Sequence, residues 1–160
     1  MRKIILIIIG LIVVGFVGTC IYFVGGVSAT IPPIKKYEFS GSVDQLLTGI
    51  QKYRLTNPDI TFQITERTGN KQNGYGTYFD IKIKIDTSIM EYNLECEKSS
   101  KEGGPVKTLI QLIGAHNEMN YAVGGYGING TGVKSMVKDF ENRFLAKLQI
   151  QQHIVITPVQ

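Results

Sequence analysis

Hydrophobic and polar residues follow distinct patterns in different parts of the chain. Residues 4 to 27 are 24 consecutive uncharged positions, nearly all Ile, Leu, Val, Phe and Gly. A membrane-spanning helix needs about 20 apolar residues to cross a hydrocarbon core of about 30 Å, so this stretch predicts a transmembrane helix. Alternating and helical patterns follow it, and they predict one folded domain.

Alternation of apolar and polar residues predicts the strands of this domain. The candidates are 36–39, 60–64, 79–85, 90–97 and 106–114, the last with apolar residues on both faces, as in a central strand. A turn over residues 86–89 would close a hairpin between the third and fourth candidates. The register expected there pairs Ile85 with Met90, Ile83 with Tyr92, Ile81 with Leu94, Phe79 with Cys96 and Lys84 with Glu91. The charged residues of these strands then form a solvated sheet face.

Helical spacing appears twice. Ser42 and Gln45 have the spacing of a capping box, and they predict a helix over about 43–55 that ends before Pro58. The second helix is expected over 133 to about 148. Its apolar face is Val133, Val137, Phe140, Phe144 and Leu148, with Met136 and Leu145 beside it. The tail over 153–159 is β-branched and contains a proline, which suits an edge strand or an unstructured end.

The predicted fold class is α+β. A transmembrane helix precedes a mainly antiparallel sheet of four to six strands, with one short helix and one long C-terminal helix packed on one face. The domain boundaries are 1–29 for the membrane segment, 30–36 for a proline-containing spacer and 37–160 for a single α+β domain. The element order resembles that of helix-grip ligand-binding domains. That resemblance implies an apolar cavity between a curved sheet and the last helix.

Three fates of the N-terminal segment fit its residues. An uncleaved signal-anchor is favoured by length, because the apolar part of a cleaved signal peptide normally spans 7 to 15 residues. Cleavage after Ala29 and lipidation of Cys20 are the alternatives. Arg2 and Lys3 favour a cytoplasmic amino terminus, which places the domain outside the cytoplasm, whereas cleavage would release a secreted or periplasmic domain.

Charge and cysteine content exclude some functions. The chain has 17 basic and 13 acidic residues, but the part from Thr30 onward carries only 15 minus 13, or +2. Lys and Glu are interspersed there without a basic stripe, so nucleic-acid binding is not expected. Cys20 and Cys96 are not expected to pair, and Cys96 is interpreted as a small core residue.

A glycine-rich run precedes the second predicted helix. Residues 125–130 match the G-x-G-x-x-G spacing of dinucleotide-binding loops. That motif needs a further parallel strand and an acidic residue about 20 positions on, which an antiparallel domain does not supply. We therefore interpret the run as a turn-forming connection and expect no cofactor. A contact surface at this loop would involve Tyr121, Tyr126, Gly125, Gly127 and Gly130.

His116, Glu118 and His153 are the candidate metal ligands. Zinc sites need three or four converging ligands, and spacing alone does not bring these residues together, so no metal site is expected. Spacing also reveals no catalytic residue. The leading hypothesis is a membrane-anchored, non-enzymatic accessory or interaction module of an envelope complex, with a protein partner in the membrane or envelope. The alternatives are an apolar-ligand-binding domain and an enzyme with a membrane-proximal substrate.

Overall fold

The computed structural model describes residues 32–70, 74–99 and 103–159. The predicted membrane segment at 4–27, with Cys20 and the site after Ala29, lies outside the described residues. Within them, no helix is both long and apolar enough to cross a membrane. Residues 32–160 group into one compact unit by their contacts.

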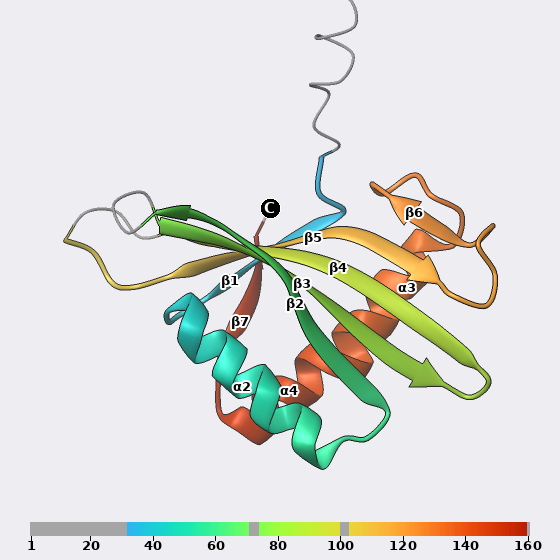
Figure 1. Ribbon diagram of the computed structural model, residues 1–160, viewed down its shortest axis with the longest axis horizontal. Coiled ribbons are helices and arrows are strands. Elements are labelled where there is room, and N and C mark those ends of the chain that lie inside the picture. The colour runs from blue at the N-terminus through green and yellow to red at the C-terminus, as the bar shows by residue number, and fades with distance from the viewer. Residues whose placement is uncertain (1–31, 71–73, 100–102, 160) are drawn as a thin grey trace, which may run out of the picture. The chain divides into compact units, whose positions relative to one another are not determined.

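One sheet of seven antiparallel strands forms this unit (Figure 1). The strands are β1 (Lys35–Phe39), β2 (Ile60–Asn70), β3 (Gly74–Ile85), β4 (Ser88–Lys98), β5 (Thr108–Asn117), β6 (Gly124–Tyr126) and β7 (Ile156–Val159). Their order is β2-β3-β4-β5-β1-β7, and β6 also pairs with β5. The predicted α+β class and antiparallel sheet are confirmed. The expected count of four to six strands is wrong, because β6 has only three residues and therefore shows no alternation.

Both helical segments lie under the same face of the sheet (Figure 1). α2 (Val43–Thr56) begins with the predicted capping box, in which Ser42 Oγ accepts a hydrogen bond from Gln45 N at 3.2 Å and Gln45 Oε1 accepts one from Ser42 N at 2.9 Å. The long C-terminal helix runs through α3 (Val133–Asp139), the π-helical turn η1 (Phe140–Leu145) and α4 (Ala146–Gln152). It is the long last helix that the apolar spacing predicted.

The core fills the space between the sheet and the helices. Every residue of the predicted apolar face of the last helix is buried, and the Phe140 ring lies 4.9 Å from Tyr92 and 5.3 Å from Phe144. Cys96 is fully buried, as predicted. The remaining space in this core is about 10 Å³, close to the smallest volume that holds one water molecule. The described core therefore has no room for the apolar ligand that the helix-grip resemblance implied.

The β3–β4 hairpin has a different register from the one expected. Ile83 lies opposite Met90 and Ile81 opposite Tyr92, a shift of two residues that keeps each side chain on its predicted face. The turn contains only two residues, because Asp86 adopts φ +54° and so allows a tight connection from Ile85 to Ser88. Asp tolerates this left-handed conformation better than most residues. In the observed register Asp80 lies opposite Asn93, whereas the expected register would have placed it opposite Glu95, a pair of like charges.

Candidate functional site

The chain enters the described domain beside β6. Ile34 N donates a hydrogen bond to Leu112 O at 2.7 Å, and β1 then runs along β5. Two residues further along β5, Gly114 lies opposite Tyr126 of β6. β6 therefore continues the line of β1 on the same side of β5, and the beginning of the domain is close to the glycine-rich run (Figure 1).

Residues 117–132, which we call the aromatic loop, have a defined hydrogen-bonded structure. Asn117 Oδ1 accepts hydrogen bonds from the backbone N–H groups of Met119 at 2.9 Å and Asn120 at 3.2 Å. Asn120 Oδ1 accepts one from Ala122 N at 3.1 Å. Such side-chain-to-backbone bonds replace the pairing that the chain loses on leaving β5. Asn117 and Asn120 thus hold the first part of the loop, up to Ala122.

Glycine is required where this loop returns to the sheet. Gly124 has φ +115°, and a β-carbon there would lie 2.3 Å from the backbone oxygen of Ala115. Of the predicted contact residues, Gly125 lies in β6 opposite Ala115, and Gly127 and Gly130 lie in the segment that leads into α3. Because β6 is antiparallel to β5, the described strands around this motif do not provide the parallel context of a dinucleotide site.

The aromatic loop exposes four large apolar side chains. The exposed fractions are 68% for Met119, 92% for Tyr121, 58% for Tyr126 and 43% for Ile128. Single exposed apolar residues are common on protein surfaces, whereas a group of them indicates an interaction site. Both tyrosines that the sequence singled out therefore project from a loop of fixed geometry.

His116 of β5 contacts this loop. It faces outward from β5, and its ring packs edge-on against Tyr126 with the ring centres 4.9 Å apart. Glu118 is held by Lys82, which also pairs with Glu91 at 3.3 Å. His153 ends α4, roughly 30 Å away along a 20-residue helix that starts near β5 and β6. The structure thus places His116 near Glu118 and leaves His153 apart.

No group of three His, Cys, Asp or Glu residues in the described part of the chain has the arrangement of a metal site. None of the three cavities found among the described residues is lined by His116, Glu118 or His153, although one of them includes Gln152 and Ile154, the neighbours of His153. Glu118 is instead paired with Lys82, and the His116 ring packs against Tyr126.

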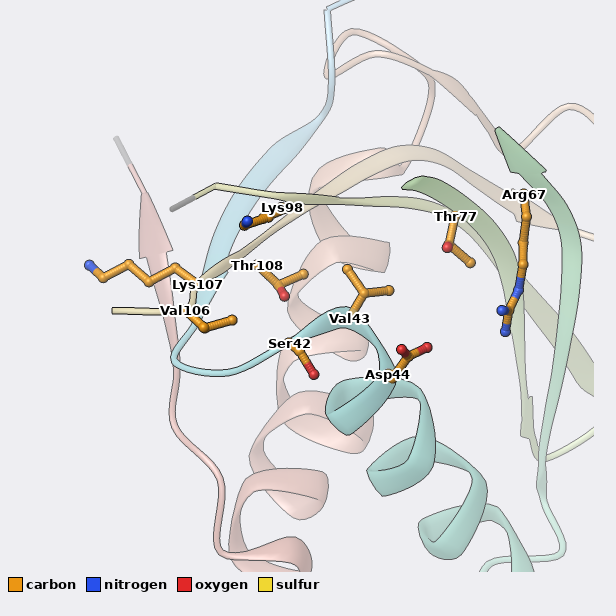
Figure 2. Close-up of a pocket in the computed structure, with 9 residues that line it drawn as sticks. All are labelled: Ser42, Val43, Asp44, Arg67, Thr77, Lys98, Val106, Lys107 and Thr108. Carbon is orange, nitrogen blue, oxygen red and sulfur yellow. The ribbon is translucent and has the colours of Figure 1, made fainter. Parts of the chain in front are cut away.

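A second feature, which the sequence did not predict, is a cavity of about 340 Å³ at the first turn of α2. We call it the α2 pocket (Figure 2). Its lining residues are Ser42, Val43, Asp44, Arg67, Thr77, Lys98, Val106, Lys107 and Thr108. It lies where the helix-facing side of the sheet continues past the apolar core.

A β-bulge directs Arg67 into this pocket. Ile64 lies opposite Phe79 but Glu66 lies opposite Tyr78, so that one extra residue interrupts the alternation of β2. Arg67 consequently lies opposite Thr77, on the helix-facing side, whereas unbroken alternation from Ile64 would have turned it outward. Figure 2 shows both side chains pointing from the sheet toward α2.

The charges around the pocket are only partly compensated. Lys107 Nζ donates to Glu38 Oε1 at 2.6 Å and points away from the pocket (Figure 2). In the described part of the chain, Arg67, Lys98 and Asp44 take part in no ion pair. A ligand in the pocket would therefore meet the cations of Arg67 and Lys98 and the carboxylate of Asp44.

Comparisons of the chain with protein-family models, with curated proteins and with solved structures find no match.

Proposed function

We propose that this protein is a membrane-anchored, non-enzymatic interaction module that binds a partner protein at the bilayer surface through the aromatic loop. The observation that carries the proposal is the position of that loop. The loop exposes four apolar side chains, and its strand β6, which carries Tyr126, continues the line of β1 near Ile34, at the beginning of the described domain.

The spacer limits how far this surface can lie from the membrane. Thr30 to Ile34 includes two consecutive prolines, which favour an extended conformation of about 3.1 Å per residue. Five such residues reach roughly 15 Å. A spacer this short between a membrane segment and the domain supports a partner in the membrane or envelope.

The composition of the loop favours a protein partner over lipid. Segments that bind a lipid surface are normally rich in Lys and Arg, which attract anionic headgroups. Residues 117–132 contain neither, and they carry an acidic residue, Glu118. Tyr and Met are among the residues enriched in protein interfaces. The two tyrosines and Met119 are therefore the side chains that we expect to contact the partner.

Site-specific photocrosslinking in the native membrane tests the proposal. A photoreactive phenylalanine analogue would replace Tyr121 in the full chain, and a matched variant would carry it at Ile150, which is 73% exposed on α4. We expect a discrete protein adduct from position 121 and none from position 150. Adducts of equal yield from both positions, or adducts with lipid alone, would contradict a partner-binding role for the loop.

A further inference from the structure

The α2 pocket is separate from the aromatic loop and plays no part in the function proposed above. We propose that it binds a small molecule through a carboxylate or phosphate group. Its volume of about 340 Å³ is at the lower end of the range for small-ligand sites, roughly 300 to 1,000 Å³.

The first support is the arginine that the bulge turns inward. Bulges re-aim side chains next to functional sites, and this one exchanges an inward-facing Glu66 for an inward-facing Arg67. A guanidinium group binds carboxylate and phosphate oxygens through two parallel hydrogen bonds. Arg67 is exposed, and no acidic side chain of the described residues pairs with it.

A buried threonine lines the pocket beside Arg67. Thr77 is only 2% exposed, and its side chain points into the pocket (Figure 2). Thr77 and Arg67 are opposite residues of neighbouring strands, so their β-carbons lie roughly 5 Å apart and both can reach one bound group.

The first turn of α2 supplies further donors. Ser42 caps the N–H of Gln45, but the N–H groups of Val43 and Asp44 have no acceptor within the helix. This helix has 14 residues, and its N-terminus carries a partial positive charge. Val43 and Val106 provide apolar walls for the rest of the ligand.

The Asp44 carboxylate opposes an anion, and this gives the proposal a distinctive test. An oxyanion held by Arg67 would be repelled by Asp44, whereas a ligand that also carries a cation would be attracted to it. Asp44→Asn should therefore tighten the binding of a simple anion by roughly two- to five-fold, since an exposed charge pair contributes up to about 1 kcal/mol.

The experiment is an NMR titration of the full chain in zwitterionic detergent micelles with inorganic phosphate, with ionic strength held constant by chloride. We expect saturable shifts of the amides of Val43, Asp44 and Thr77. Arg67→Gln should weaken binding roughly ten- to a hundred-fold, as expected for a lost charge-assisted hydrogen bond. Arg54→Gln is the matched control, because it removes an arginine from the last turn of α2, at the opposite end of that helix from the pocket.

A second titration with micelles containing phosphatidylglycerol distinguishes a lipid headgroup from a free ligand. Saturable shifts with either phosphate source support the site, provided that Arg67→Gln weakens the binding and Arg54→Gln does not. The proposal is overturned if the three amides show no saturable shift, if Arg54→Gln weakens binding as much as Arg67→Gln, or if Asp44→Asn weakens it.

Discussion

Glu141 connects the last helix to the sheet, and its removal offers a quantitative test of the packing. Its carboxylate accepts hydrogen bonds from Tyr37 Oη at 3.1 Å and from Lys35 Nζ. The Tyr37 side chain is only 2% exposed. Burial and the neighbouring Glu141 carboxylate raise the pKa of Tyr37 well above its usual range, so that the phenol remains a hydrogen-bond donor.

Glu141→Ala should lower the free energy of unfolding by about 2 kcal/mol. The change leaves the buried Tyr37 hydroxyl without an acceptor, which costs about 1 to 3 kcal/mol. The lost ion pair with Lys35 adds about 0.5 kcal/mol at most, because its two side chains are 35% and 31% exposed. In a Tyr37→Phe background no hydroxyl remains, and Glu141→Ala should then cost only about 0.5 kcal/mol.

Urea unfolding of the full chain in non-ionic micelles, followed by circular dichroism, measures all four members of this double-mutant cycle. Glu141→Gln serves as the control, because it keeps an acceptor for Tyr37 and should lose less stability than Glu141→Ala. Equal costs of Glu141→Ala in the two backgrounds would refute the reasoning, because they would show that the buried hydroxyl does not depend on Glu141.

Three further predictions concern the sheet. A hydrogen bond to Glu95 at 2.7 Å raises the pKa of Tyr78 to about 12, so this pair stabilises the fold fully below pH 10 and loses its effect as the pH rises through 12. Glu95→Gln should therefore lower the pH at which Tyr78 ionises in a titration followed by tyrosinate absorbance. An unchanged titration step would argue against the hydrogen bond. Burial raises the pKa of the Cys96 thiol and keeps it from solvent. In a Cys20→Ser chain, a disulfide reagent should therefore react with Cys96 only after denaturation. Fast reaction of the native chain would place Cys96 at the surface. Asp86→Gly should leave the urea midpoint nearly unchanged, whereas Asp86→Val should cost about 1 to 2 kcal/mol; equal effects would mean that φ +54° is not required at the turn.

Local patterns predicted the parts of the fold that depend on neighbours in the sequence. Ser42 and Gln45 identified the start of α2, and the spacing of Phe140, Phe144 and Leu148 identified the buried side of the last helix. Asp139 and Arg143, four residues apart on this helix, form an ion pair at 3.6 Å. Each of these signals involves residues within one helical turn or two.

Features that depend on backbone conformation or distant pairing were not predictable in this way. Alternation gives the same faces in either hairpin register, and the choice between them rests on the conformation of Asp86. The α2 pocket requires a bulge before Glu66 and the arrival of α2 beneath Arg67. The only local sign was that regular alternation stops after Ile64, which does not say where an extra residue is inserted.

The position of β1 between β5 and β7 has a consequence for the order of folding. β1 is the first strand to be synthesised, yet one of its neighbours, β7, is the last. Pairings between residues far apart in the sequence form slowly, and until they form the unpaired edge of β1 is exposed to other chains. The described sheet cannot be completed until β7 has been synthesised, so the edge of β1 that faces β7 stays unpaired until then.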